Sequence, residues 1–313
     1  MNRPHVLLIG NVNVDIIMGP QAPWPEPGTE VVLPDYEMRV GGQSANSAMA
    51  LEALGVPFLM LANAGGDMLG RWLRESFGEA GRDWPVSDRP TTVSVGVTHP
   101  NGERTFFTNE GHLEAFGPAD ILPRIPERAP EGSVALLVGT FLSPLVVEAL
   151  SAIIAACKRA NYAIALDTGW PPRGWTDQAL AGFKQWLVQT DILLLNEVES
   201  RALSGLDDLH AGAARLRAMM PEHATLVIKR GPEGAEAWQD GDAAHVPTPP
   251  VTVADSIGAG DIFNAGFLSA RLAGRDLRSC VRAGVHLASA VIATRPRSFR
   301  VDLGDVLRTE PRI

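Results

Sequence analysis

The chain has 313 residues, of which 45% are hydrophobic and 20% charged, a composition typical of a globular protein with a large buried core. Its 27 Lys and Arg residues against 36 Asp and Glu residues give a formal charge of −9, which disfavours a nucleic acid or an anionic membrane as partner. The only cysteines, Cys157 and Cys280, argue against a disulfide scaffold and favour a reducing compartment. The first apolar run ends at Gly10 and is too short for a signal peptide or a membrane span, so we expect a cytoplasmic protein.

Short apolar runs rich in branched residues alternate with helical stretches along the chain. The runs lie at residues 6–9, 58–62, 134–138, 163–166, 192–195 and 226–229. The helical stretches lie at 44–54, 145–160, 176–189, 209–220, 262–273 and 277–294. Buried parallel strands joined by helices predict one α/β domain over residues 1–313, with a doubly wound, mostly parallel sheet and helices on both faces. Ligands of such sheets bind at the carboxyl ends of the strands.

Two segments break this alternation. Residues 29–40 and 92–108 carry period-2 patterns, and Asn101-Gly102 offers a tight hairpin turn within the second. These patterns predict a small antiparallel β sheet with one face covered. Because both segments flank sheet-forming units near the strand ends, we interpret residues of about 15–40 and 91–110 as a lid over a site. The alternative is an edge extension with no gating role.

One glycine-containing motif precedes the helical stretch at 262–273. It reads Asp255-Ser256-Ile257-Gly258-Ala259-Gly260-Asp261. The glycines predict a sharp turn into a helix whose first N–H groups, from Gly258 to Asp261, suit an anion. A carboxylate at Asp261 repels that anion unless chemistry requires it, so a general base facing a transferred phosphate is the economical explanation. We expect this carboxylate to stay ionised beside the helix N-terminus; a plain helix cap is the alternative.

Two further polar groups follow near the N-terminus. Gly41-Gly42-Gln43-Ser44-Ala45-Asn46 opens a helix, and Asn46 in its first turn offers both a donor and an acceptor to a hydroxyl. Asp15, in Asn11-Val12-Asn13-Val14-Asp15, follows the first strand and is placed to accept hydrogen bonds from two neighbouring hydroxyls. A turn with a helix-start residue, and an exposed loop acid, are the respective alternatives.

Two more groups follow later strands. In Asn196-Glu197-Val198-Glu199, the side chains of Asn196 and Glu199 stand at positions i and i+3 of a helix start. They are either oxygen ligands for Mg²⁺ or the two partners of a capping box. A strand also ends in a cation and glycines at Lys229-Arg230-Gly231-Pro232-Glu233-Gly234. This pattern fits either the wall of a nucleotide pocket or a hairpin turn.

Together these motifs resemble the PfkB, or ribokinase-like, family of carbohydrate and nucleoside kinases over essentially the whole chain. The resemblance rests on Gly41-Gly42-x-x-x-Asn46, on Asn196-x-x-Glu199 and on the motif from Asp255 to Asp261, in that order. It implies an ATP-dependent, Mg²⁺-dependent kinase with Asp261 as catalytic base and Gly258, Ala259 and Gly260 as anion hole. It also implies Asn196 and Glu199 on the Mg–phosphate side, with magnesium held through water, and Asp15, Asn13, Gly42, Gln43 and Asn46 on the sugar side. Nucleotide contacts fall on Asn196, Lys229, Gly231, Gly234 and Gly260, and a monovalent cation such as K⁺ falls near Asp255.

Departures from the family pattern concern the substrate. Gln43 stands where ribokinases proper carry Lys, and residues 141–144 hold no acid where a ribose-binding Glu is expected, which argues against ribose itself. Arg104 is placed to meet a substrate carboxylate or phosphate, or else faces solvent. We therefore expect a sugar or sugar-acid kinase, with a homodimer through the lid. A nucleoside kinase, with Phe106, Phe107 or Phe116 as a shelf for the base, and a catalytically inactive sugar- or nucleotide-binding regulator are the alternatives.

Overall fold

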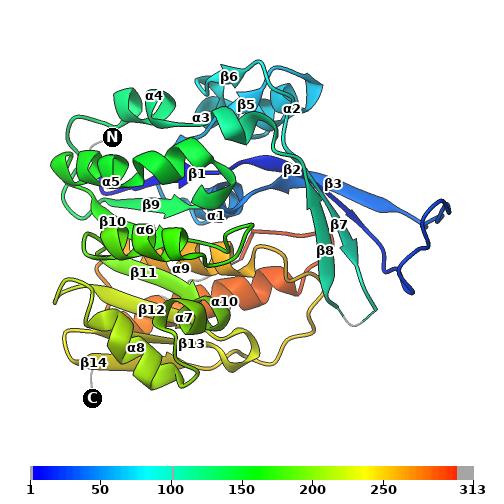
Figure 1. Cartoon of the computed structure of the whole chain (residues 1–313). Helices are drawn as coiled ribbons and strands as arrows, with labels where there is room; N and C mark the ends of the chain where they lie inside the picture. The colour runs from blue at the N-terminus through cyan, green and yellow to red at the C-terminus, as the bar shows by residue number, and fades with distance from the viewer. Residues whose placement is uncertain (1–2, 101, 302–313) are drawn as a thin grey trace.

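The computed structural model describes residues 3–100 and 102–301. Within these residues the chain builds a central eight-stranded sheet (Figure 1). From one edge to the other it comprises β14 (Asp242–Val246), β13 (Ala235–Gln239), β12 (Thr225–Lys229), β11 (Ile192–Asn196), β10 (Ala163–Asp167), β9 (Val134–Val138), β1 (Val6–Gly10) and β4 (Phe58–Leu61). Every pair of adjacent strands from β12 to β4 in this row is parallel. The predicted doubly wound, mostly parallel sheet is confirmed.

An antiparallel hairpin at one edge of the sheet was not predicted. β13 pairs antiparallel with β12 and with β14. The turn between β13 and β14 contains Asp240 and Gly241, with φ of 49° and 86°. Asp-Gly is a residue pair that tight hairpin turns favour, so the turn signal was present in the sequence. The flanking strands are short and alanine-rich, which left their apolar pattern weak.

Alternate residues of the parallel strands face two apolar cores. In β1, Val6 and Leu8 belong to one core, and Leu7 and Ile9 belong to the other. The first core is covered by α1 (Gln43–Ala53), α9 (Ala259–Leu272) and α10 (Leu277–Ile292). The second is covered by α5 (Pro144–Arg159), α6 (Asp177–Leu187), α7 (Glu197–Ser204) and α8 (Leu209–Arg217). Figure 1 shows these two groups on opposite faces of the sheet, as the alternation of strand and helix predicted.

Several short elements carried too little periodicity to be predicted. They are α2 (Met68–Ser76), α3 (Gly78–Arg82), α4 (Pro118–Ile121), β5 (Ala64–Gly65), β6 (Val86–Ser87), η1 (Gly111–Ala115), η2 (Leu122–Arg124), η3 (Thr140–Leu142) and η4 (Gly231–Glu233). Asp67 is the N-cap of α2, and its side chain accepts a hydrogen bond from the N–H of Gly70 at 2.9 Å, a helix cap that the sequence analysis did not identify. Among the residues described, no helix combines the length and the hydropathy needed to cross a membrane.

A second, four-stranded sheet projects from the α/β body (Figure 1). Its strands lie in the order β3 (Tyr36–Gly41), β2 (Asn13–Met18), β7 (Val93–Thr98) and β8 (Arg104–Thr108). The two outer pairs are antiparallel, and the central pair of β2 with β7 is parallel.

Part of the sequence prediction for this region was wrong. The strand expected over residues 29–40 begins only at Tyr36, and β2 (Asn13–Met18) forms in a segment for which no strand pattern was identified. Pairing with β7 imposes the extended form on β2, which short-range patterning did not show. The predicted turn residue Asn101 lies outside the described residues. Its neighbour Gly102 has φ of 85° and donates its N–H to the carbonyl of His99 at 2.9 Å.

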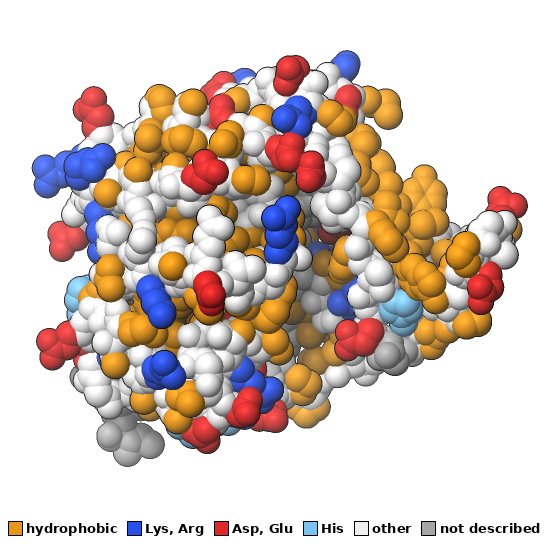
Figure 2. All heavy atoms as spheres, in the orientation of Figure 1, with side chains coloured by type: hydrophobic (Ala, Val, Ile, Leu, Met, Phe, Trp, Pro, Cys, Tyr) orange, Lys and Arg blue, Asp and Glu red, His pale blue; other side chains and the backbone are white. Residues whose placement is uncertain are grey.

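The two faces of the four-stranded sheet differ in chemistry. Residues directly opposite one another in a register share a face. One face therefore carries Asn13, Asp15, Arg39, Ser94, Arg104, Phe106 and Thr108. The other carries Val14, Ile16, Tyr36, Met38, Val95 and Phe107, of which Tyr36, Met38 and Phe107 are exposed. Figure 2 shows hydrophobic side chains gathered over the projecting sheet. We call these the polar face and the apolar face.

Candidate active site

Three adjacent parallel strands end at polar residues. β10 ends at Asp167, β11 at Asn196 and β12 at Lys229. Because parallel strands run in one direction, the three side chains lie at one edge of the sheet. A cavity of about 710 Å³ at this edge is lined by all three, together with Gly260 and Asp261 at the start of α9. We call it the strand-end cavity.

The N-terminus of α9 faces the strand-end cavity. Its N-cap residue Gly258 has φ of 74°, and a Cβ there would lie 2.6 Å from Nδ2 of Asn46, so both conformation and space require glycine. Ala259 donates its N–H to the carbonyl of Ser256 at 3.2 Å. The N–H groups of Gly260 and Asp261 follow in the first turn, where a helix offers them no internal partner. This end of the helix is suited to an anion in the cavity.

Asp261 is the carboxylate at this helix end. It is 6% exposed, and its Oδ2 accepts a hydrogen bond from Nδ2 of Asn46 at 2.9 Å. Oδ1 has a longer contact, 3.4 Å, with Nε2 of Gln43. Burial, and then the negative charge of Asp167, raise the pKa of Asp261 to about 7. The expectation of a carboxylate that is always ionised at neutral pH is therefore corrected, because loss of hydration outweighs the helix dipole.

A buried ion pair lies beside Asp261, and one of its members was not predicted. Nζ of Lys229 is 2.6 Å from Oδ2 of Asp167 and 3.3 Å from Oδ1 of Asn264, which itself donates to Asp167 at 2.7 Å. Burial lowers the pKa of Lys229, but the charges of Asp167 and Glu199 outweigh it, so the net shift is upward. Asp167 was missed because the predicted strand stopped one residue short. The signal was the same as for Asn196: a polar residue at the end of an apolar strand.

Asn196 and Glu199 form the capping box that was one of the two interpretations. The N–H of Glu199 donates to Oδ1 of Asn196 at 2.8 Å, and the N–H of Asn196 donates to Oε2 of Glu199 at 2.8 Å. Both side chains also line the strand-end cavity. Glu199 is 4% exposed, and burial followed by the charge of Asp167 raises its pKa to about 7. Capping therefore coexists with a position at the cavity wall.

Gly231 and Gly234 stand between β12 and β13 and line the strand-end cavity. Their φ values are 52° and 93°, which favour glycine. The segment is thus the connection of an antiparallel pair and a wall of the cavity at once.

The predicted substrate residues near the N-terminus form a second polar group. Nδ2 of Asn13 donates to Oδ1 of Asp15 at 2.7 Å and to Oγ of Ser94 at 3.2 Å. Burial raises the pKa of Asp15, while the guanidinium of Arg39 opposes the shift. Gly42, with φ of 100°, forms the N-cap of α1 directly before Gln43. Asp15 is therefore a buried member of the polar face and not an exposed loop acid.

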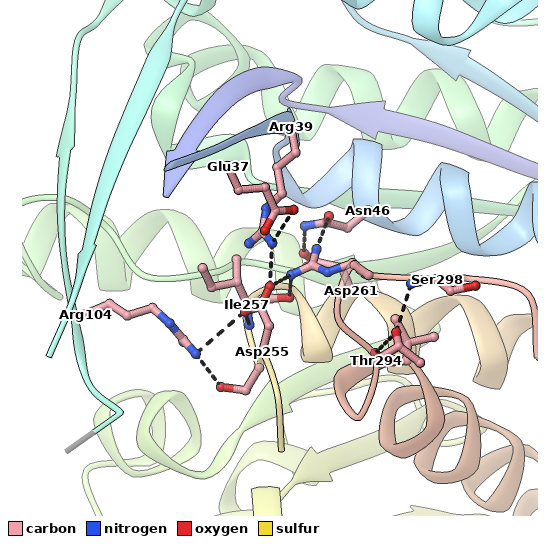
Figure 3. Close-up of polar contacts among 12 residues, drawn as sticks. Glu37, Arg39, Asn46, Arg104, Asp255, Ile257, Asp261, Thr294 and Ser298 are labelled. Atoms are coloured by element: carbon pink, nitrogen blue, oxygen red, sulfur yellow. Dashed lines mark hydrogen bonds and ion pairs between the residues drawn. The ribbon is translucent and has the colours of Figure 1, made fainter. Parts of the chain in front are cut away.

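Asp255 is surrounded by guanidinium groups (Figure 3). Arg39 from β3 forms an ion pair with its Oδ2, and Nη2 of Arg297 lies 2.8 Å from the same oxygen. Arg104 from β8 lies 3.8 Å from Oδ1 and donates to Oγ of Ser256 at 2.9 Å. Arg104 thus contacts the motif from Asp255 to Asp261 and is not a freely solvated side chain. A monovalent cation was expected near Asp255, but in the structure arginine side chains already balance the charge of this carboxylate.

The fold brings together most of the predicted residues. Asp261, Asn46 and Gln43 meet at the junction of α9 and α1, and Asp261 and Gln43 also line the strand-end cavity. Asp15 and Asn13 lie on the polar face of the four-stranded sheet, which Arg39 and Arg104 join to Asp255 and Ser256. Arg39 and Arg297 were not predicted. In the sequence, Arg39 was one charged residue in an alternating pattern and Arg297 belonged to no motif, so neither was recognised as a site residue.

Comparisons with known proteins agree with this geometry. A family model described as pfkB family carbohydrate kinase matches residues 3–298. A fructokinase of Klebsiella pneumoniae is 30% identical over 250 residues, covering 76% of this chain and 80% of that protein. A ribokinase of Haemophilus influenzae is 25% identical over 302 residues, covering 94% and 93%. The structure of Arabidopsis thaliana ribokinase complexed with ribose and ATP superimposes with a TM-score of 0.77 at 22% identity, covering 98% of this chain and all of that one.

Proposed function

Because the chain belongs to the pfkB family of carbohydrate kinases, and is thus a phosphotransferase that uses a sugar hydroxyl as acceptor, we propose that Asp261 is its catalytic base and that the first turn of α9 is its anion hole. One observation carries the proposal. The carboxylate of Asp261 lies at the wall of the strand-end cavity, in the same helix turn as the N–H groups suited to an anion. A base and an anion-binding helix end are thereby presented to the same space.

The reaction follows from this placement. Asp261 accepts the proton of the attacking hydroxyl, and a pKa of about 7 makes it a competent base near neutral pH. The amides of Gly260 and Asp261, with Gly258 and Ala259 setting the turn, stabilise negative charge on the transferred phosphoryl oxygens. Asn46 holds the carboxylate through one N–H of its amide, which leaves the second N–H as a donor to the substrate.

The strand-end cavity is the proposed ATP site. Its volume of about 710 Å³ is within the usual range for small-molecule pockets. Lys229 supplies a cation beside Gly260, and Asn196, Gly231 and Gly234 line the wall. The structure of a ribokinase of this fold in complex with ribose and ATP supports the assignment.

The residues at the cavity wall fit Mg²⁺ held largely through water and phosphate. Burial leaves Glu199 with a raised pKa next to the charge of Asp167, and a divalent cation within reach of both would favour the ionised carboxylates. No cluster of three or more His, Cys, Asp or Glu side chains arranged for a metal occurs in residues 3–100 and 102–301. Mg²⁺ commonly binds through one or two carboxylates plus substrate phosphates, so Asn196 and Glu199 with Asp167 suffice. When bound, it supplies positive charge to the phosphate oxygens.

The four-stranded sheet is proposed as the lid of the acceptor site. Its polar face carries Asn13 and Asp15, and Arg104 reaches the loop before α9. Its exposed apolar face, with Tyr36, Met38 and Phe107, supports the expected homodimer through the lid, because apolar surface of this kind favours contact with a second chain.

A sugar or sugar acid is the first candidate acceptor. Hydroxyl partners are available in Asn13, Asp15, Gln43 and Asn46, with Gly42 permitting close approach. Arg39 and Arg104 lie on the same polar face and could pair with a substrate carboxylate or phosphate. Buried nitrogens of both guanidinium groups have no hydrogen-bond partner among the described residues.

One observation keeps a nucleoside as the second candidate. Phe106 and Thr108 of β8, both on the polar face, line a cavity of about 1180 Å³ together with Phe141. Phe106 is therefore the aromatic residue placed to support a base. Phe116 is fully buried in the core, and Phe107 lies on the apolar face, so neither offers the expected shelf.

The test is a coupled ADP-release assay over pentoses, hexoses, sugar acids and nucleosides, with wild type, Asp261→Asn and the exposed control Asp242→Asn. We expect one acceptor class to raise ADP release, and Asp261→Asn to reduce turnover by orders of magnitude while ATP still binds. Unchanged turnover in Asp261→Asn would remove the base role. Binding of ATP and sugar by the wild type without turnover would support the inactive regulator.

A further inference from the structure

Arg297 occupies a buried position behind the proposed catalytic residues. Its side chain is 7% exposed, and it lies in the segment that follows α10. The carbonyl of Ile292, at the end of α10, accepts the N–H groups of Ala254 at 2.8 Å and Asp255 at 3.0 Å. The N–H of Ser298 donates to Oγ1 of Thr294 at 2.9 Å, which fixes the turn that contains Arg297. The segment is thereby attached to the loop before α9.

The guanidinium of Arg297 reaches three groups around the start of α9. Nη2 donates to Oδ2 of Asp255 at 2.8 Å and to the carbonyl of Ile257 at 2.5 Å. Nη1 donates to Oδ1 of Asn46 at 3.2 Å. Asp255 in turn accepts the N–H of Ile257 through Oδ1 at 2.9 Å. The turn that precedes Gly258 is therefore held at a backbone carbonyl and, through Asp255, at a backbone N–H.

The contact with Asn46 decides which way its amide points. Oδ1 accepts from Arg297, so Nδ2 is left to donate to Oδ2 of Asp261 at 2.9 Å. A rotated amide would set its NH₂ against the guanidinium N–H groups and its oxygen against the carboxylate. Both contacts would then be repulsive, and only one amide orientation satisfies Arg297 and Asp261 together.

We propose that Arg297 is a positioning residue for phosphoryl transfer. Through Asn46 it orients the carboxylate of Asp261, and through Asp255 and Ile257 it sets the turn that presents the amides of α9. This inference rests on the proposed base role of Asp261. Arg297 itself does not line the strand-end cavity, and its hydrogen-bond partners are Asn46, Asp255 and Ile257 and not the proposed base.

Steady-state kinetics of four variants test the proposal. They are Arg297→Ala, Asn46→Ala, the double variant, and Arg300→Ala as the matched control, an exposed arginine three residues further on. Loss of a buried, charge-assisted contact predicts a kcat roughly tenfold to a hundredfold lower for Arg297→Ala, with the KM for ATP about unchanged. Because Arg297 acts partly through Asn46, the double variant should be less impaired than the product of the two single effects. Arg300→Ala should match the wild type.

Two readouts separate positioning from a purely structural role. The hydrogen bond from Asn46 lowers the pKa of Asp261. If Arg297→Ala loses the orientation of Asn46, the acidic limb of its kcat/KM profile should therefore move to higher pH. Asp167 and Lys229 also face Asp261, and both are unchanged in this variant. Added guanidinium at low millimolar concentration should restore part of kcat in Arg297→Ala and none in Arg300→Ala. Arg297→Lys keeps the charge near Asp255 without the planar fork, and we expect it to fold with kcat still reduced.

The outcomes are distinct. A kcat equal to wild type in Arg297→Ala rejects the inference and leaves the proposed function intact. The inference is also rejected if Arg297→Ala lowers kcat but leaves the pH profile unchanged, if its effect multiplies strictly with that of Asn46→Ala, and if guanidinium gives no rescue. Those results together would indicate a structural role for Arg297. If Asp261→Asn turns over at the wild-type rate, the base role of Asp261 is rejected, and the inference about Arg297 is rejected with it.

Discussion

Asn46 and Asp261, 215 residues apart in the chain, are joined by a hydrogen bond of 2.9 Å from the amide nitrogen to Oδ2. The two residues come from α1 and α9, which cover the same face of the sheet. The contact occupies one carboxylate oxygen, and the partner of Oδ1 within residues 3–100 and 102–301 is Nε2 of Gln43 at 3.4 Å. Because a carboxylate oxygen can accept more than one hydrogen bond, Oδ1 of Asp261 can still accept from a substrate hydroxyl, in a setting where burial disfavours the charge of the carboxylate.

Replacing Asp261 with Asn should stabilise the folded protein at neutral and alkaline pH. The pKa of Asp261 is raised from 3.8 to about 7, so between these values the folded state binds more protons than the unfolded state. Stability contributed by the neutral form is then lost as pH rises through that window. At about pH 8 we expect Asp261→Asn to gain on the order of 1–3 kcal/mol in free energy of unfolding, measured by urea denaturation. The gain should shrink towards about pH 4, and a loss at pH 8 would contradict the burial argument.

Catalytic efficiency should rise with pH through about 7. A general base works in its ionised form, and the pKa of Asp261 is about 7 because burial and Asp167 disfavour that form. The profile of kcat/KM against pH measures it. Glu199 has a pKa of about 7 as well, so Glu199→Gln is the control, and the limb should persist in that variant. A profile without an acidic limb between about pH 5.5 and 8 would exclude Asp261 as the titrating base.

Glu199→Gln should separate capping from catalysis. Gln retains a side-chain oxygen that can accept the N–H of Asn196, so the capping box and the fold should survive. The negative charge facing the strand-end cavity is lost, and we expect a higher Mg²⁺ concentration for half-maximal turnover, by about threefold to tenfold. Mg²⁺ titration of wild type and variant, with Tm recorded for both, is the measurement. An identical titration would leave Glu199 with capping alone.

Turnover should not require K⁺. Asp255 is already paired with Arg39 and Arg297 and lies 3.8 Å from Arg104, so a further cation at this carboxylate would meet like charges. Replacing K⁺ by a bulky organic monovalent cation at constant ionic strength should change turnover by less than about twofold. A large activation specific to K⁺ would show that the cation binds elsewhere or displaces an arginine.

Much of the fold followed from patterns within single segments. The apolar runs gave the parallel strands, and the helical stretches gave the covering helices, because a segment such as 134–138 must be buried on both faces wherever it lies. β2 and the β13–β14 hairpin escaped prediction because their extended form depends on pairing with strands elsewhere in the chain. α2 and its neighbours were too short to show a period.

The candidate site divides in the same way. The motif from Asp255 to Asp261, with Asn46, Asn196 and Lys229, could be singled out because each stands at a turn or strand end where polar residues need an explanation. The partners of these residues could not be found in this way. Asp167 became apparent only beside Lys229, and Arg297 only beside Asn46 and Asp255.

The sequence by itself determined the alternation of strand and helix, the glycines that turn the chain into α9, and the kind of chemistry that those motifs suit. These are local properties, set by side-chain period and backbone freedom. Only the tertiary structure decided the protonation of Asp261, the guanidinium groups around Asp255 and the orientation of the Asn46 amide. Those depend on burial and on charges brought together from distant segments, and the free energy of a buried charge is set by its neighbours in space and not by its neighbours in the chain.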